Sequence, residues 1–209
     1  MRPAFAGHED LRSACHHFNL FLIHLNTPVM DNSTENVTLY AAFVTDILKN
    51  YEGKKDDYKG LFDMVKDYDL TDPFGKVPIR LYNDMCAWIE SELGKFNLIR
   101  VGRNVGETAF TGMVANGLLK EVSTPLQVME ALVAVASAMI QDPKLRGWKI
   151  VNSTKNSITM LRTQTFNRQL QLGLLDGLVK KSGVKGVKVD FSKSVEDGSE
   201  FDEYFITWN

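Results

Sequence analysis

The stretch from Gly147 to Arg162 reads GWKIVNSTKNSITMLR, and it determines the fold more than any other part of the chain. Two short runs rich in β-branched and bulky apolar residues, 147–152 and 157–162, flank the polar segment 153–156. Runs of this kind favour strands, and a polar segment of this length favours a tight connection between them. The stretch therefore predicts a β-hairpin.

The segment that follows the hairpin predicts a helix with one buried face. Thr165 and Asn167 offer side-chain oxygens for the unpaired amides of a helix start. Leucines then recur at four-residue spacing, at Leu170, Leu174 and Leu178, until Ser182 and Gly183 end the pattern.

Two more strands are predicted after this helix. Apolar residues alternate with polar ones through 187–191 and again, on one side of the strand, through 204–208. The segment Glu196–Ser199 contains Gly198 and separates the two runs, so a second hairpin is expected to complete the unit.

The order strand, strand, helix, strand, strand resembles the C-terminal half of heme nitric-oxide/oxygen-binding (H-NOX) domains. The resemblance is carried by GLLDGL at 173–178 and by Asp197-Gly198-x-x-Phe201-x-x-Tyr204-x-Ile206-x-Trp208. The chain is also similar to the related 4-vinyl-reductase domains and to the Golgi transport-particle subunits of the same fold. The resemblance covers residues 36–208 in element order and implies an α+β fold. In that fold a helical half, 31–145, packs on an antiparallel sheet unit, 146–209.

Apolar periodicity predicts four or five helices before the sheet unit. They are expected within 34–51, 56–68, 79–93, 97–117 and 124–141, with a loop at 71–78 where two prolines and a glycine occur. Glycines at 102, 106, 112 and 117 interrupt the fourth helix, which indicates close backbone packing or a bend. No strand precedes Gly102, so a phosphate-binding loop is not expected there.

The fifth helix has the best-marked start. Thr124 is placed to cap it, Pro125 suits its first position, and Gln127 completes a capping box. Its body, 128–140, is apolar on every face, which predicts a helix in the middle of the protein. Its small residues either leave space for a ligand or let neighbouring helices approach closely; they are Ala131, Ala134, Ala136, Ser137 and Ala138.

Composition narrows the classes of function. The chain has 209 residues, 44% of them apolar, and a formal net charge of −2, with basic and acidic residues interspersed. One domain with a leader is expected, without a basic face for nucleic acid or a polybasic membrane patch. Two cysteines do not make a disulfide framework, so a cytoplasmic location is expected.

Residues 1–30 are predicted to be a poorly ordered leader. They hold Cys15 and all four histidines, His8, His16, His17 and His24. The apolar run at 18–23 is too short to span a membrane, and no signal-peptide cleavage pattern follows it. The Cys-His-His cluster matches no standard metal site, and Met30 offers an alternative start of the protein.

The resemblance implies a heme site, but its residues are not found where the family has them. H-NOX domains ligate heme iron through a histidine on the helix that leads into the sheet and hold the propionates with a Tyr-x-Ser-x-Arg motif. The helix 124–141 has no histidine, and the matching hairpin position reads LRTQT at 161–165. The cysteines of the 4-vinyl-reductase relatives are missing from 194–204. We therefore expect no cofactor and no metal.

Other chemistry-bearing residues allow two interpretations each. Cys86 is either a buried neutral thiol or a reactive or lipidated one. The carboxylates between Asp197 and Glu203 either bind a cation or form a solvated turn. Arg162 and Arg168 either meet an anionic ligand or face solvent.

The sequence shows no catalytic machinery, because no histidine follows His24 and no Gly-x-Ser-x-Gly elbow is present. We expect a non-enzymatic sensory or signalling module that binds a small apolar molecule or a signalling protein. The expected ligand-binding residues are Phe110, Met113, Leu132, Ala136, Met139 and Leu161. The alternatives are a pure interaction or homodimerisation scaffold and a protein that handles tetrapyrroles or lipids.

Overall fold

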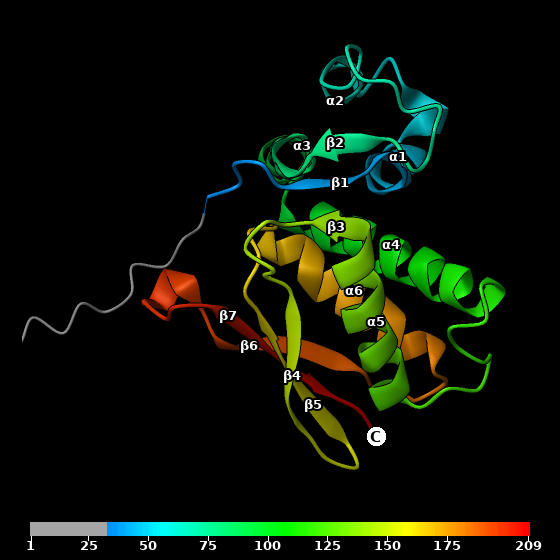
Figure 1. Ribbon diagram of the computed structural model, residues 1–209, viewed down its shortest axis with the longest axis vertical. Helices are drawn as coiled ribbons and strands as arrows, with labels where there is room; N and C mark the ends of the chain where they lie inside the picture. The colour runs from blue at the N-terminus through cyan, green and yellow to red at the C-terminus, as the bar shows by residue number, and fades with distance from the viewer. Residues whose placement is uncertain (1–32) are drawn as a thin grey trace, which may run out of the picture. The chain divides into compact units, whose positions relative to one another are not determined.

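The computed structural model describes residues 33–209 (Figure 1). The predictions made for residues 1–30, including the ordering of the leader, Cys15 and the four histidines, lie outside the described residues. Within the described part, no helix combines the length and the hydropathy needed to cross a membrane.

Four antiparallel strands form the larger sheet, in the order β4-β5-β7-β6. The strands are β4 (Trp148–Ser153), β5 (Ser157–Arg162), β6 (Lys188–Lys193) and β7 (Asp202–Thr207). Both predicted hairpins are present, because β4 pairs with β5 and β6 pairs with β7. With the helices described below, the predicted α+β class is confirmed.

Helix α6 (Arg168–Lys181) connects β5 to β6. The Asn167 side chain caps it as predicted, by accepting hydrogen bonds from the amides of Gln169 (2.9 Å) and Leu170 (3.2 Å). The prediction of a single buried face was wrong. Buried residues surround the helix axis and include Leu170, Gln171, Gly173, Leu175, Asp176 and Val179. The helix is buried on several sides because it contacts α4 and α5 as well as strands β6 and β7.

Helices α4 (Lys95–Ala115) and α6 touch backbone to backbone. A Cβ atom added to Gly102 would lie 2.0 Å from the carbonyl oxygen of Leu170, and one added to Gly173 would lie 1.9 Å from that of Ile99. The predicted close packing is therefore confirmed at Gly102. At Gly112 an added Cβ would meet nothing within 4 Å, so that glycine has no part in the contact.

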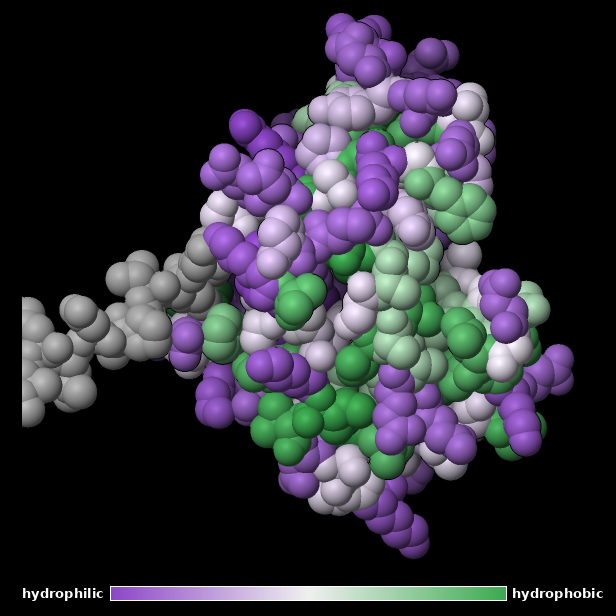
Figure 2. All heavy atoms as spheres, viewed as in Figure 1, coloured by the Kyte–Doolittle hydropathy of each residue, from purple (hydrophilic) through white to green (hydrophobic). Residues whose placement is uncertain are grey.

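Helix α5 (Pro125–Met139) begins with the predicted capping box. The Thr124 hydroxyl accepts from the Gln127 amide (3.3 Å), and the Gln127 side-chain oxygen accepts from the Thr124 amide (2.9 Å). Its expected position in the middle of the protein was wrong, because Ala134, Ser137 and Ala138 are exposed. Figure 2 shows weakly hydrophobic residues at the surface over α5, bordered by hydrophilic ones. Alanine is tolerated on a surface, so a run that is apolar on every face did not require full burial.

The N-terminal part contains helices and a small sheet. The helices are α1 (Ala41–Lys49), the 3₁₀ turn η1 (Glu52–Lys54), α2 (Lys59–Asp63) and α3 (Ile79–Leu93), and a further 3₁₀ turn, η2 (Val195–Asp197), precedes β7. Helix α3 matches the predicted 79–93, whereas only five residues of the predicted 56–68 are helical. Strands β1 (Thr38–Tyr40), β2 (Lys76–Pro78) and β3 (Ile140–Gln141) pair in the order β2-β1-β3. These strands were missed because two or three residues are too few to show an alternating pattern.

The glycine contact predicts opposite effects for two alanine substitutions in α4. Gly102→Ala is expected to lower the free energy of unfolding by about 3 kcal/mol or more, since its Cβ meets backbone atoms that cannot turn away. Gly112→Ala should instead raise it by up to ~1 kcal/mol, because alanine favours a helix and has room there. Denaturant midpoints of the two variants measure this difference, and equal midpoints would contradict the close contact.

Candidate ligand cavity

A cavity of about 320 Å³ lies between the N-terminal helices and the sheet unit. Helices α1, α3, α4, α5 and α6 and strands β3, β4 and β5 all contribute to its wall. Most of the wall is apolar, and Phe43, Val105, Val135, Ile140 and Leu174 are among its residues. Its volume is at the lower end of the range typical of sites for small organic ligands.

The structure brings four of the six expected ligand-binding residues together around this cavity. They are Met113 of α4 and Leu132, Ala136 and Met139 of α5. Phe110 is buried on another side of α4, where the Lys181 ammonium lies 5.9 Å from its ring centroid. Leu161 is half-buried on β5 and is not among the lining residues.

Strand alternation explains the position of Leu161. Successive side chains of a strand point to opposite faces of the sheet. On β5 the buried residues are Ile158, Met160 and Arg162, and Arg162 rather than Leu161 lines the cavity. The two-residue spacing from Ile158 was the sequence signal for this, but an apolar residue was favoured over a charged one.

Of the small residues on α5 for which the sequence left two roles open, Ala136 lines the cavity, whereas Ala134, Ser137 and Ala138 are exposed. The small residues of α4 fall into two groups. Gly102 and Gly106 let α4 approach α6 closely. Ala109 and Gly112 instead line the cavity, where larger side chains would fill part of it.

Arg162 supplies a cation at the cavity wall. Its side chain is buried, and its guanidinium carbon lies 4.5 Å from the ring centroid of Trp148 and 4.2 Å from that of Phe166. Nη1 donates to the Gln171 side-chain oxygen (3.3 Å) and Nη2 to that of Gln164 (3.4 Å). Burial lowers the pKa of Arg162 to about 10, which leaves it charged at neutral pH.

Arg168 has a different environment. It forms ion pairs with Glu196 and with Asp202, the latter at 3.1 Å, and donates to the Ser194 hydroxyl (2.6 Å). Its guanidinium also lies 4.2 Å from the ring centroid of Phe191. Arg168 therefore links the start of α6 to the β6–β7 connection, and it neither faces open solvent nor lines the cavity.

Two further residues singled out in the sequence, Glu203 and Cys86, have defined surroundings in the structure. Glu203 pairs with Lys193 (3.1 Å) and accepts from the Ser192 hydroxyl (2.8 Å). Within residues 33–209, no group of three or more histidine, cysteine, aspartate or glutamate side chains is placed to hold a metal ion. Cys86 on α3 is fully buried, and burial raises the pKa of its thiol.

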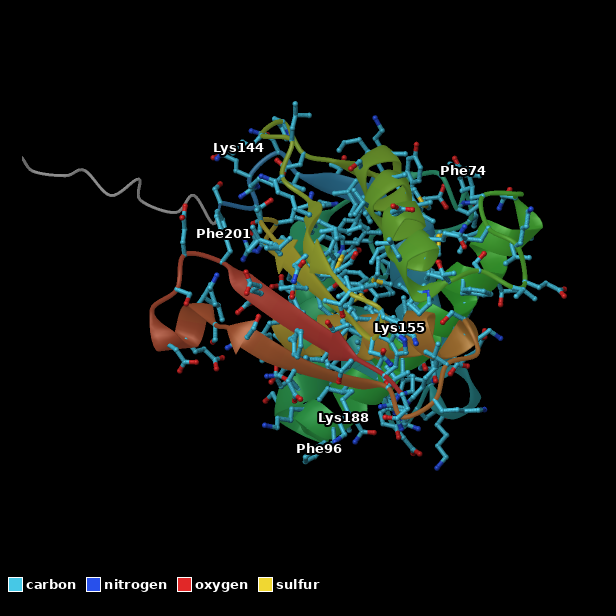
Figure 3. The ribbon with its side chains drawn as sticks, turned by 90° about the horizontal axis from the view of Figure 1, so that it is seen from below. Phe74, Phe96, Lys144, Lys155, Lys188 and Phe201 are labelled. Atoms are coloured by element: carbon cyan, nitrogen blue, oxygen red, sulfur yellow. The ribbon has the colours of Figure 1, made fainter. Side chains whose placement is uncertain are left out.

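A second, more polar hollow lies between the start of α4 and strand β6. Phe96 of α4 and Lys188 of β6 both line it and occur along the same edge in Figure 3. Two of its charged residues, Arg103 and Asp176, are ion-paired with each other, and Lys180 joins them at 2.8 Å from Asp176. The charges around this hollow are compensated to a greater extent than that of Arg162.

Solved structures of H-NOX proteins share this fold. A mutant of the K. algicida H-NOX protein, in the Fe(II) unliganded state, is 17% identical with a TM-score of 0.58 over 82% of this chain and 97% of that one. The S. oneidensis H-NOX protein in the Fe(II)NO state is 11% identical with a TM-score of 0.60 over 80% and 98%. No protein-family model and no curated protein match the sequence. At these identities the likeness establishes the H-NOX-like fold alone.

The side chains that could ligate iron decide whether this cavity fits a heme, the group that H-NOX proteins bind. Residues 33–209 contain no histidine. Burial raises the pKa of the Tyr82 phenol well above its usual value, so this lining residue stays neutral. The thioethers of Met113 and Met139 also line the cavity, but a thioether usually ligates heme iron together with a histidine.

Burial of Cys86 predicts that its thiol does not react in the native protein. In a Cys15→Ser background, a disulfide reagent is expected to label Cys86 at least ~1000-fold more slowly in the native chain than in guanidinium, because only the exposed thiolate is nucleophilic. Rapid native labelling would place Cys86 among reactive thiols and contradict its buried position.

Proposed function

We propose that this chain is a non-enzymatic sensory or signalling module that binds a small, largely apolar molecule in the cavity between α4, α5 and the sheet. The observation that carries the proposal is the cavity itself, lined mainly by apolar side chains from five helices and three strands. Sites for small organic molecules are typically concave and apolar, with a few placed polar groups.

The position of the cavity supports a role in sensing. Its wall combines the helices of the N-terminal part with β4, β5 and α6 of the sheet unit. A ligand that fills it contacts both parts at once and stabilises the arrangement that it fits best. The S. oneidensis H-NOX protein of the same fold is solved in an Fe(II)NO ligation state, which agrees with ligand binding by this fold, although the similarity establishes only the fold.

We further propose that the module works without heme. The support is the donor set: neutral Tyr82 and two methionine thioethers are weak candidates for the single protein ligand of a heme iron. The four histidines of the chain all precede residue 33, and none is on the helix 124–141.

The cavity favours a ligand-binding module over the alternative of a scaffold with a solid core. The exposed large apolar residues Phe74, Phe96, Val122 and Leu145 lie in different loops and elements. Isolated apolar side chains of this kind are normal on a protein surface and do not by themselves indicate an interface.

Blocking the cavity predicts loss of binding without loss of the fold. Ala136→Trp places an indole in the cavity and should weaken binding of the neutral fluorescent probe N-phenyl-naphthylamine by about tenfold or more. Ala134→Trp is the matched control, because Ala134 is on the same helix but exposed. Fluorescence titration of both variants provides the comparison.

Two outcomes would contradict the ligand site. One is unchanged probe binding in the Ala136→Trp protein, and the other is equal loss in both variants. Far-UV circular dichroism of the two proteins checks that both remain folded. Native mass spectrometry of the unmodified protein, purified without added ligand, shows whether a small molecule copurifies.

The proposal of a heme-free module predicts the visible spectrum. The full-length protein, expressed with a heme precursor and then incubated with hemin, should show no Soret band after gel filtration. A stable Soret band would contradict it. Alanine variants of the four histidines would then identify whether residues 1–32 supply the ligand.

A further inference from the structure

Arg162 is a buried cation that forms no ion pair in the described part of the chain. Burial lowers its pKa, and the only carboxylate of that part whose more distant charge acts to raise this pKa is Asp202. Its exposed fraction is 5%, and no carboxylate of residues 33–209 lies within ion-pair distance of it. Its Nε atom is buried and has no hydrogen-bond partner among those residues. Removing a charge from water without pairing it is strongly unfavourable, so this arrangement calls for an explanation.

Two aromatic rings lie against the guanidinium. Trp148, directly across from Arg162 in the β4–β5 pair, and Phe166, in the connection to α6, have ring centroids 4.5 and 4.2 Å from the guanidinium carbon. Such cation–π contacts compensate part of the lost hydration. They involve the face of a guanidinium, whereas its N–H groups lie along the edge, where a further partner would bind.

Within residues 33–209, the N–H groups along the edge of the Arg162 guanidinium donate only to neutral side chains, and over long distances. The two bonds to the Gln171 and Gln164 side-chain oxygens measure 3.3 and 3.4 Å. Hydrogen bonds from a guanidinium to a carboxylate are shorter, about 2.7–2.9 Å, and roughly twice as strong as neutral ones. An incoming carboxylate can therefore replace these bonds with stronger ones.

Three carboxylates in the surrounding elements already have other partners and do not pair with Arg162. Asp202, opposite Arg162 in the β5–β7 pair, binds Arg168 (3.1 Å) and the Val195 amide (3.1 Å). Asp142 pairs with Arg146 (2.7 Å). Asp46, the carboxylate that lines the cavity, is paired with Lys49 at 2.9 Å.

We infer that the ligand of this cavity is an amphipathic carboxylate, with its hydrocarbon body against the apolar wall and its carboxylate paired with the edge of Arg162. The inference rests on the proposed function, since it specifies the chemistry of a ligand in the same cavity. Two features select this class. The planar guanidinium suits the two oxygens of a carboxylate, and the apolar wall disfavours small hydrophilic anions.

The first experiment compares ligands on the unmodified protein. Isothermal titration measures Kd for decanoate, decanol and decyl phosphate, each below its aggregation concentration. Decanoate is expected to bind about tenfold or more tightly than decanol, since a hydrogen-bonded charge pair is added to the same hydrocarbon contacts. Equal affinities, or tightest binding of decyl phosphate, would overturn the carboxylate assignment.

The second experiment uses substitutions of two arginines. Arg162→Met should raise the Kd for decanoate to that for decanol and leave the Kd for decanol unchanged. Arg80→Met is the control, because the Arg80 side chain is 80% exposed on α3, and it should keep the preference for decanoate. A preference that survives in a folded Arg162→Met protein would overturn the inference. If that variant does not fold, the ligand comparison on the unmodified protein decides.

The outcomes separate this inference from the proposed function. If decanol binds as tightly as decanoate, the inference of a carboxylate ligand is contradicted, whereas the proposal of an apolar ligand site is not. Absence of binding for decanol, decanoate and N-phenyl-naphthylamine removes both.

Discussion

The contact between α4 and α6 is the constraint on which the rest of the structure depends. Each helix carries two glycines four positions apart, Gly102 and Gly106 on α4 and Gly173 and Gly177 on α6, so both lie on one face of their helix. Cβ atoms at these four positions would lie 1.9 to 2.4 Å from carbonyl oxygens of the other helix. The side chain that any other residue brings would force the helices apart. This contact fixes α6 between α4 and the sheet strands that it also touches.

The cavity lies beside this close contact. Beyond Gly106, α4 lines it with Ala109, Gly112 and Met113, and α5 provides Ala136 from another side. The same residue type thus acts in two ways on one helix: Gly102 lets backbones touch, while an added Cβ at Gly112 would meet nothing within 4 Å. Close packing and open space are adjacent because α4 is long enough, at 21 residues, to contact α6 and line the cavity at once.

Sequence periodicity predicted the long elements and failed where local pattern and tertiary environment disagree. Helix α3, the capping box at Thr124 and both hairpins follow from spacing and caps that act within a few residues. The small sheet had no such pattern, because its strands are too short and their partners are distant in sequence. Hydropathy predicted that α5 lies in the middle of the protein, yet α6 has that position. The glycines on one face of α4 and of α6 let these two helices approach closely, and apolar content alone does not indicate such an approach. Four of the residues expected at the site line the cavity, whereas Leu161 does not. Arg162, for which the sequence left open an anionic ligand or solvent exposure, lines the cavity from the same strand.

The two arginines at the ends of the β5–α6 connection show why charge alone did not reveal their roles. Both are largely buried, and both lie against aromatic rings. Asp202 is opposite Arg162 in the sheet, but its carboxylate pairs with Arg168, which Glu196 also contacts. The charge of Arg168 is thereby used to hold α6 to the β6–β7 connection. Arg162 is left with two amide oxygens, and its position on the inner face of β5 gives a mainly apolar cavity one cationic group. Glu196 pairs with Arg168 in any case, so the direction of the Asp202 side chain decides only whether Arg162 has an ion-pair partner. Sequence spacing contains no information about that direction.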